Sequence, residues 1–336
     1  MTVQGQAFER AYQDERAVWL QWGSYEAAAL PDAGANLIAF RDTARGYAIL
    51  REPAEGQMDH FRANPGIYGI PVLFPPNRYE DGTFTWNGKT YTFPVNEERT
   101  GNHLHGFFHT AQWQVDDYGV TKTESYVVLS ISIGEGHPIH QYLPHNFTIR
   151  LRYSLSGAGL LQHVSVHNTG SDAMPCLIAF HTAINAPFAA GSKAEEYRFT
   201  LTAGKRWELN DRMLPTGKHQ PLAPEEELMR TTGVSPFWTS LDNHYTSETR
   251  NGRNMMELTD TREGVTLVYD AGTAYKQWMV WNNGATPGFF CPEPQLNLVN
   301  APNVNLPAED IGLVGLEPGA IWESTSRLYI RAANPN

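Results

Sequence analysis

The sequence has few cysteines and no long apolar run. Only two cysteines, Cys176 and Cys291, occur in 336 residues, and their wide separation matches no metal-ligand spacing. Two buried thiols in a reducing compartment are therefore expected rather than a disulfide. No apolar stretch approaches the length of a bilayer span. The N-terminus lacks the basic start and apolar segment of a signal peptide. We expect a cytoplasmic protein with no membrane association.

Positive charge is also scarce. The chain has 25 Lys and Arg residues against 36 Asp and Glu residues, which gives a formal net charge of −11. Nucleic acids and anionic membrane surfaces both require a basic face, so neither is an expected partner. Net charge does not say where the charges lie, and a local basic pocket is compatible with this composition. The sequence therefore favours a small molecule as the partner.

Helical signals are few, and strand signals dominate. Residues 224–229 (PEEELM), with proline and acids in the first turn, predict one short helix. Residues 7–20 are compatible with an amphipathic helix, although Trp19, Trp22 and Tyr25 crowd its end. Elsewhere apolar residues alternate with polar ones, as in strands that bury one face. The alternating segments are 127–133, 147–155, 162–166, 265–269 and 277–281.

The clearest local prediction is a hairpin at residues 83–93 (TFTWNGKTYTF). Asn87 and Gly88 tolerate the positive φ angles of a type I′ turn, and alternating aromatic residues flank them. Many short strands separated by Gly, Pro, Asn and Asp imply a sandwich or barrel. The Pro- and Asn-rich segment 301–318 predicts a long surface loop. We expect an all-β fold in which residues 1–336 form one large β-sandwich domain.

Three closely spaced histidines are candidate metal ligands. His103, His105 and His109 form the pattern His-x-His-x-x-x-His, and on a strand the first two would share a face. A metal site of the cupin type normally adds a glutamate a few residues later, but residues 110–112 are TAQ. We therefore expect no metal, and a metal-dependent enzyme stays as an alternative.

Three other residues are candidate functional residues because of the sequence around them. Glu293 lies in the apolar segment 289–294 (FFCPEP), where poor solvation would raise its pKa and suit it to act as a base. His181 ends an apolar, strand-like run, where it could equally be a structural core residue. Arg78 follows Pro-Pro-Asn and could be an ordinary turn arginine. Taken singly, none of the three establishes a function.

The order of several short motifs along the chain is more specific. They are 71–78 (PVLFPPNR), 82–84 (GTF), 87–91 (NGKTY), 104–106 (LHG), 113–115 (WQV), 180–181 (FH), 241–245 (LDNHY), 292–295 (PEPQ) and 316–319 (LEPG). In this order they resemble the aldose 1-epimerase (galactose mutarotase) family over most of the chain. The resemblance implies a large β-sandwich, a supersandwich, with the sugar in an open cleft.

The resemblance also implies roles for six residues. Glu293 is similar to the general base of the family, and His181 is similar to its general acid. His105 resembles a histidine that binds near the ring oxygen and C1 of the sugar. The residues that resemble ligands of sugar hydroxyls are Asn77, Arg78 and Asp242.

The chemistry of ring opening agrees with these roles. A proton must leave the C1 hydroxyl of the cyclic aldose and another must reach the ring oxygen, which suits a carboxylate and an imidazolium. Rotation about C1–C2 and reclosure then give the other anomer, with no metal or organic cofactor. Arginine and aspartate supply the donors and acceptors that sugar hydroxyls need. We predict a cofactor-free sugar mutarotase that acts on a free aldose, as a monomer or homodimer.

Two departures from the family pattern mark a divergent member. Residues 182–188 (TAINAPF) replace the usual Tyr-Phe-Asn-Leu, and 299–301 (VNA) stand for the usual Pro-Asp-Ala, which leaves the preferred sugar open. One alternative function is a hexose-6-phosphate 1-epimerase, which needs a cationic pair to which Arg62 and Arg78 could contribute. Another is a non-catalytic carbohydrate-binding protein that kept the cleft.

Overall fold

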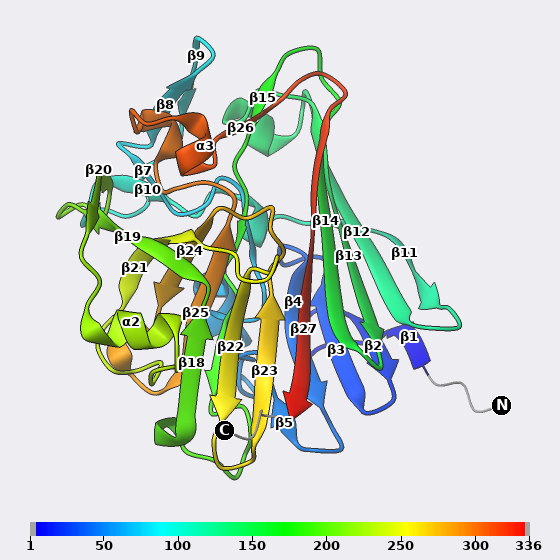
Figure 1. Cartoon of the computed structure of the whole chain (residues 1–336). Coiled ribbons are helices and arrows are strands. Elements are labelled where there is room, and N and C mark those ends of the chain that lie inside the picture. Colours follow the sequence, from blue (N-terminus) through cyan, green and yellow to red (C-terminus); the bar gives the residue numbers. More distant parts are fainter. Residues whose placement is uncertain (1–4, 333–336) are drawn as a thin grey trace.

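The computed structural model describes residues 5–332, which form an all-β sandwich of antiparallel sheets (Figure 1). The first large sheet has eight strands and runs from β18 at the left of Figure 1 to β11 at the right. Its strands, in spatial order, are β11 (Gln114–Val120), β12 (Ser125–Ile133), β13 (Phe147–Ser156), β14 (Gly159–Asn168), β27 (Ile321–Ala332), β23 (Val265–Asp270), β22 (Met255–Asp260) and β18 (Tyr197–Leu201). The predicted all-β sandwich is confirmed.

The second large sheet also has eight strands and lies behind the left half of the first (Figure 1). Its path is β20 (Pro215–Gln220), β19 (Ala203–Leu209), β21 (Asp242–Ser247), β24 (Gln277–Trp281), β25 (Gly288–Gln295), β16 (Ala179–Phe180) and β6 (Val72–Leu73), and β17 (Ile184–Ala186) pairs with β25. All five alternating segments predicted from the sequence lie in strands of these two sheets.

Apolar side chains from the two large sheets meet in one core. In β13, Ile149, Leu151 and Tyr153 are fully buried and alternate with more exposed residues, so the strand buries one face. Tyr269 of β23 packs edge-to-face on Trp278 of β24, with ring centroids 6.1 Å apart. Such contacts join the sheets face to face, as in other sandwiches.

The remaining strands form smaller sheets. The five-stranded sheet contains β1 (Gly5–Glu9), β2 (Val18–Trp22), β3 (Tyr25–Leu30), β4 (Asn36–Asp42) and β5 (Tyr47–Ala48). The two-stranded sheets are β7 (Arg78–Glu80) with β10 (Asn102–Leu104), β8 (Thr83–Trp86) with β9 (Lys89–Thr92), and β15 (Met174–Cys176) with β26 (Val314–Leu316). The predicted hairpin at 83–93 is confirmed, because Asn87 and Gly88 have φ angles of 47° and 74° between β8 and β9.

A helix over residues 7–20 is wrong. This segment enters β1 and β2, which pair antiparallel from Gly5 opposite Trp22 to Glu9 opposite Val18. Gln13 has a φ of 54° in the turn between the strands, a left-handed conformation that a helix cannot contain. Pairing with the neighbouring strands therefore overrides the local helical pattern.

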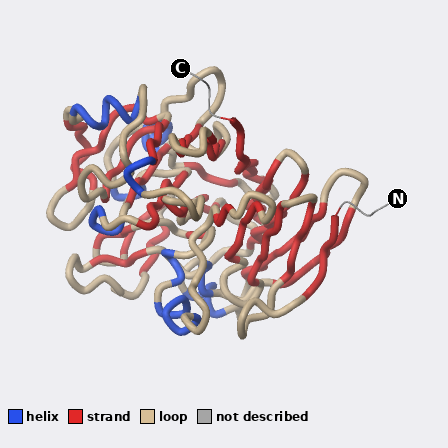
Figure 2. Tube along the Cα trace, turned by 90° about the horizontal axis from the view of Figure 1, so that it is seen from below, coloured by secondary structure: helices blue, strands red, loops and turns tan. Residues whose placement is uncertain are grey.

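The helices are short, and most lie at the margins of the sheets when the molecule is seen from below (Figure 2). They are α1 (Met58–Ala63), η1 (Pro65–Ile67), η2 (Phe108–Thr110), η3 (Pro138–Gln141), η4 (Ala194–Glu196), α2 (Pro224–Arg230), η5 (Asn283–Ala285), η6 (Ala301–Asn303) and α3 (Ala308–Ile311). The predicted helix at 224–229 is confirmed as α2. No helix within residues 5–332 combines the length and the apolar character that crossing a bilayer would require.

The predicted long loop at 301–318 is only partly irregular, because it contains η6, α3 and β26. Ala301 and Ile311 are buried in a small apolar cluster with Trp207, which gives this segment a core of its own. Cys176 and Cys291 are buried free thiols, as predicted.

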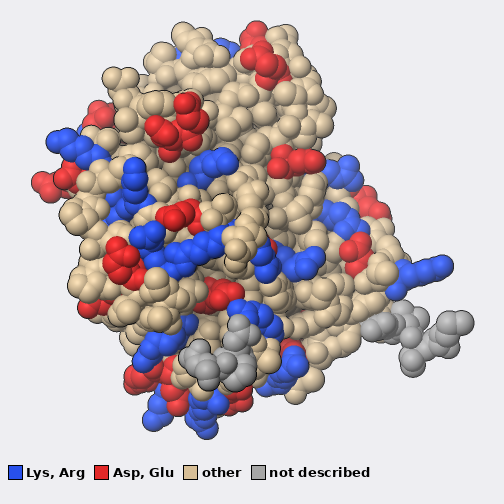
Figure 3. Space-filling view, in the orientation of Figure 1, with Lys and Arg blue, Asp and Glu red and all other residues tan. Residues whose placement is uncertain are grey.

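Charge on the molecular surface is mixed. On the face seen in Figure 3, acidic and basic side chains are interspersed, and a band of Lys and Arg side chains crosses its middle. This face therefore does not form a continuous acidic surface, although the chain has a net charge of −11.

Candidate active site

One pocket, of about 190 Å³, brings together all six site residues proposed from the sequence. The pocket is lined by Ile67, Asn77, Arg78, Leu104, His105, His181, Asp242, Met279, Trp281 and Glu293. The six come from segments far apart in the chain, so the fold assembles the site.

Strand pairing explains how three of these segments meet. On β24, residues 279 and 281 lie two apart and therefore face the same side of the sheet. Met279 is opposite Glu293 of β25. Trp281 is opposite Asp242 of β21. Three adjacent strands thus direct Asp242, Trp281, Met279 and Glu293 toward one pocket.

Two left-handed turns place Asn77 and His105. Their φ angles are 56° and 69°, and the His105 backbone N–H donates to the Asn77 carbonyl over 2.9 Å. The Asn77 side-chain oxygen accepts a hydrogen bond from the Arg78 backbone N–H at 2.9 Å. Gly106 follows, and a Cβ atom there would lie 2.2 Å from the Phe74 carbonyl oxygen, so this close approach requires glycine.

The pocket contains a buried histidine–carboxylate pair. His181 Nε2 lies 3.2 Å from Glu293 Oε1, and the two side chains are only 7% and 1% exposed. Gln295 Nε2 donates to Glu293 Oε2 over 3.3 Å. His181 is the first residue after β16, and its backbone N–H donates to the Pro71 carbonyl over 3.1 Å.

Burial shifts both members of this pair toward their neutral forms. Burial, assisted by the Asp242 charge, raises the pKa of Glu293 well above its usual range, as its apolar sequence context predicts. Burial lowers the pKa of His181 to about 4. A single proton shared across the 3.2 Å contact is therefore favoured over an ion pair.

His105 lies beside this pair. Its ring is perpendicular to that of His181, with centroids 5.1 Å apart, and its buried Nδ1 has no hydrogen-bond partner. Burial and then the neighbouring His181 lower the pKa of His105 well below its usual value. His105 also lines the pocket, and a neutral imidazole has one ring nitrogen that accepts and one that donates a hydrogen bond.

Of the three histidines considered as metal ligands, His105 and His109 have ring centroids 6.4 Å apart, and His103 is engaged elsewhere. β10 ends at Leu104, so His103 and His105 do not share a strand face. His103 Nδ1 instead lies 2.7 Å from the Pro94 carbonyl oxygen, and its ring packs against those of Phe93 and Phe107, each with a centroid distance of 5.0 Å. Among residues 5–332, no group of three or more His, Cys, Asp or Glu side chains is arranged to hold a metal ion.

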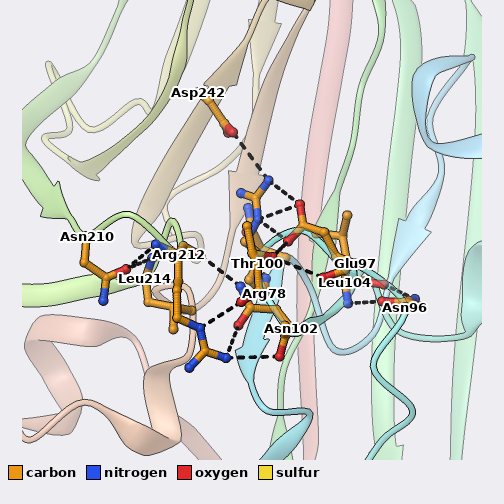
Figure 4. A network of polar contacts seen from close by, with 12 residues as sticks. Arg78, Asn96, Glu97, Thr100, Asn102, Leu104, Asn210, Arg212, Leu214 and Asp242 are labelled. Atoms are coloured by element: carbon orange, nitrogen blue, oxygen red, sulfur yellow. Dashed lines mark hydrogen bonds and ion pairs between the residues drawn. The ribbon is translucent and has the colours of Figure 1, made fainter.

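Arg78 is held by two carboxylates (Figure 4). Its Nε and Nη2 donate to Glu97 Oε2 and Oε1 at 2.9 and 3.0 Å, and Nη2 lies 3.4 Å from Asp242 Oδ2. Burial would raise the pKa of Glu97, but hydrogen bonds from Arg78 and Thr100 hold it below its usual value. Burial raises the pKa of Asp242 despite the nearby Arg78. No motif in the sequence singles out Glu97.

Arg62 does not join this site. It lies on α1, where its guanidinium pairs with three surface carboxylates, those of Asp14, Glu15 and Asp59, at 2.6, 2.8 and 2.9 Å. It is absent from the pocket lining. The suggestion that Arg62 and Arg78 together hold a phosphate is therefore wrong for Arg62.

Comparison with known proteins points to one family. Residues 16–329 match the model of the family described as aldose 1-epimerase. A galactose mutarotase-like protein from Clostridium acetobutylicum superposes with a TM-score of 0.93 at 32% identity, over 97% of this chain and 98% of that chain.

Two similar proteins from Escherichia coli K12 are more distant. A putative aldose 1-epimerase shares the fold, with a TM-score of 0.72 and 17% identity over 98% of this chain and 99% of that chain. The uncharacterized protein YihR is 24% identical over 254 residues, which is 75% of each chain.

Proposed function

This chain belongs to the aldose 1-epimerase family, and we propose that it interconverts the α and β anomers of a free aldose by acid–base catalysis. Family membership and the mutarotase-like fold support a sugar epimerase or mutarotase activity. The observation that carries the finer proposal is the buried contact of 3.2 Å between His181 Nε2 and Glu293 Oε1 inside the pocket.

The proposed reaction begins with ring opening. Glu293 takes the proton of the C1 hydroxyl, the bond between C1 and the ring oxygen breaks as a carbonyl forms at C1, and His181 protonates the ring oxygen. Before this step, the single proton of the resting pair must be on His181. The short contact between His181 and Glu293 lets this proton pass from Glu293 to His181. The bound sugar then supplies hydrogen bonds to the charged forms that burial disfavours.

Reclosure uses the same groups in exchanged roles. The aldehyde rotates about C1–C2 and presents its other face, His181 takes the hydroxyl proton, and Glu293 returns a proton to the oxygen at C1. The pair ends with the single proton with which it started. Neither step consumes a cofactor.

The remaining lining suits a neutral sugar ring. Arg78, Asp242 and Asn77 offer donors and acceptors to hydroxyl groups, and the imidazole of His105 lines the pocket near the acid–base pair. The indole of Trp281 supplies an apolar face of the kind that packs on sugar C–H groups.

The charges in the pocket favour a free aldose over a 6-phosphate. Among the lining residues that the structure describes, Arg78 is the one Lys or Arg side chain, and Glu97 and Asp242 already neutralise it. A phosphate carries close to two negative charges and needs cationic donors of its own. The intact His181–Glu293 pair supports turnover rather than binding alone.

Polarimetry or NMR of anomer interconversion, over a panel of free and 6-phosphorylated aldoses, tests this proposal. We expect catalysis with at least one free aldose. A kcat/KM more than about tenfold higher for a 6-phosphate would correspond to about 1.4 kcal/mol of extra transition-state binding and would overturn the assignment to free aldoses. Sugar binding without catalysis would favour a carbohydrate-binding protein.

A further inference from the structure

A compact turn at residues 97–102 lies behind Arg78. The backbone N–H groups of Thr100, Gly101 and Asn102 all point to the Glu97 carbonyl, at 3.2, 2.9 and 3.3 Å, so the turn curls around this one oxygen. Gly101 has a φ of 69°, which permits the tight curl. The Glu97 side chain leaves the turn toward Arg78 and also accepts a hydrogen bond from the Thr100 hydroxyl.

The turn and its neighbour Asn96 hold both Arg78 and the residue before His105. Glu97 binds the Arg78 guanidinium with two hydrogen bonds, of 2.9 and 3.0 Å. The Asn96 side chain accepts from the Leu104 N–H at 2.6 Å and donates to the Leu104 carbonyl at 3.0 Å. Movement of this segment would therefore displace two candidate sugar ligands together.

Arg212 fastens the turn from the side away from Arg78 (Figure 4). Its Nε donates to the Thr100 carbonyl over 2.8 Å, and its Nη2 donates to the Gly101 carbonyl and to Asn102 Oδ1 over 3.0 and 3.2 Å. The Asn102 side-chain amide returns a hydrogen bond of 2.9 Å to the Arg212 carbonyl. A planar guanidinium can make these contacts at once, whereas a lysine ammonium is a point charge on a flexible stem.

Arg212 is itself held in place. It lies between β19 and β20, where Asn210 Oδ1 accepts from the Arg212 backbone N–H over 2.9 Å. Its Nη1 and Nη2 form ion pairs with Glu80 and Asp81 at 3.1 and 2.7 Å. With a side chain 33% exposed, Arg212 is at the edge of the molecule and does not line the pocket.

We propose that Arg212 is a positioning residue for the sugar site, acting through the 97–102 turn to hold Arg78. This inference rests on the proposed function for its kinetic part. Arg78 is assigned to sugar hydroxyls rather than to the reacting proton, so its displacement should weaken ground-state and transition-state binding alike. Such a loss raises KM and leaves kcat almost unchanged.

The test compares Arg212→Ala, Arg212→Lys, Glu97→Gln and the double variant Arg212→Ala/Glu97→Gln. We expect Arg212→Ala to raise KM about tenfold with kcat within about twofold, as for loss of one charge-assisted hydrogen bond. Arg212→Lys should recover part of the effect. Because Arg212 acts through Glu97, the double variant should raise KM no further than Glu97→Gln alone.

A second readout does not depend on catalysis. The Nε–H of Arg78, buried and bonded to Glu97, should give a protected arginine signal in ¹H–¹⁵N spectra, identified by its loss in Arg78→Lys. Arg212→Ala should broaden or shift this signal. The matched control is Arg253→Ala, which removes a surface arginine, 42% exposed, that bonds Asp270 and Tyr329 at 2.8 and 2.9 Å. The control should change neither KM nor the Arg78 signal.

Three results would separate the possible failures. If Arg212→Ala lowers only the unfolding temperature and leaves KM and the Arg78 signal unchanged, Arg212 is merely structural. Additive KM effects in the double variant would show that it does not act through Glu97. If the wild-type protein converts no anomer, the proposed function fails, and the Arg78 signal still decides whether Arg212 positions Arg78.

Discussion

Replacing Glu293 by glutamine should abolish mutarotation while the fold survives. The structure allows the amide to keep both contacts of the carboxylate. Its oxygen can still accept from Gln295 Nε2, now 3.3 Å from Oε2, and its NH₂ group can donate to His181 Nε2, now 3.2 Å from Oε1. Burial keeps His181 neutral, so this nitrogen can be an acceptor. What is lost is the group that takes a proton from the C1 hydroxyl.

The expected loss is large in rate and small in stability. Removing a positioned base typically costs about 10² to 10⁴ in rate, or about 3 to 5 kcal/mol of barrier. Glu293 is 1% exposed, and a neutral amide avoids the cost of burying a carboxylate. The unfolding temperature of Glu293→Gln should therefore equal or exceed that of the wild-type protein. Sugar affinity should change little, because the hydroxyl ligands stay in place.

The assay is the rate of anomer equilibration by polarimetry, corrected for the spontaneous reaction, with sugar affinity measured separately by titration. Glu323→Gln is a suitable control, because it alters another glutamate–histidine contact, the exposed pair of Glu323 and His163 at 3.5 Å. The control should retain full activity. Turnover within about tenfold of wild type by folded Glu293→Gln would remove Glu293 from the mechanism.

Three further predictions concern the same site. His181→Asn should lose kcat far more than affinity, whereas His105→Asn should lose both in steady-state kinetics, because only the second removes a ground-state hydrogen bond; weakened binding alone in His181→Asn would refute its role as the acid. The pH profile of kcat/KM should fall below about pH 4, because His181 then takes up a proton in addition to the one that the pair already holds. The profile should be flat above that pH and fall again at high pH, where Glu293, whose pKa is raised, loses the proton of the pair. A midpoint near 6.5, the ordinary histidine value, would contradict this prediction. EDTA should leave the activity unchanged, and a loss restored by a divalent ion would return His103, His105 and His109 to consideration as metal ligands.

Most of the fold could be predicted because its signals are local. Residues 147–155 alternate strictly, and the structure buries one face of β13 as that pattern requires. Asn87 and Gly88 are themselves residue types that tolerate the positive φ angles of the hairpin turn. The helix predicted for residues 7–20 was wrong because strand pairing decides the conformation of this segment. Its partners in β2 and β3 could not be identified from a local window.

The residues of the candidate site also differ in whether a local sequence motif identifies them. Its six proposed residues lie in short motifs, so their order along the chain was informative. Glu97 and Arg212 had no such motif. The segment 97–101 reads EERTG, in which Glu97 and Glu98 are equivalent as sequence, and Arg212 lies more than 100 residues away.

Physical chemistry nevertheless predicts that Arg78 has a carboxylate partner. The Arg78 side chain is only 10% exposed, and a buried guanidinium needs an anionic partner. Once Arg78 is placed in a pocket, a carboxylate beside it becomes a requirement, although only the fold selects Glu97. Asp242 makes one longer contact of 3.4 Å and has a raised pKa, so it satisfies this requirement only in part. The charge of Arg78 is thus balanced mainly from behind, by Glu97, which leaves Asp242 and the pocket face of the guanidinium free to meet a neutral, hydroxyl-rich ligand.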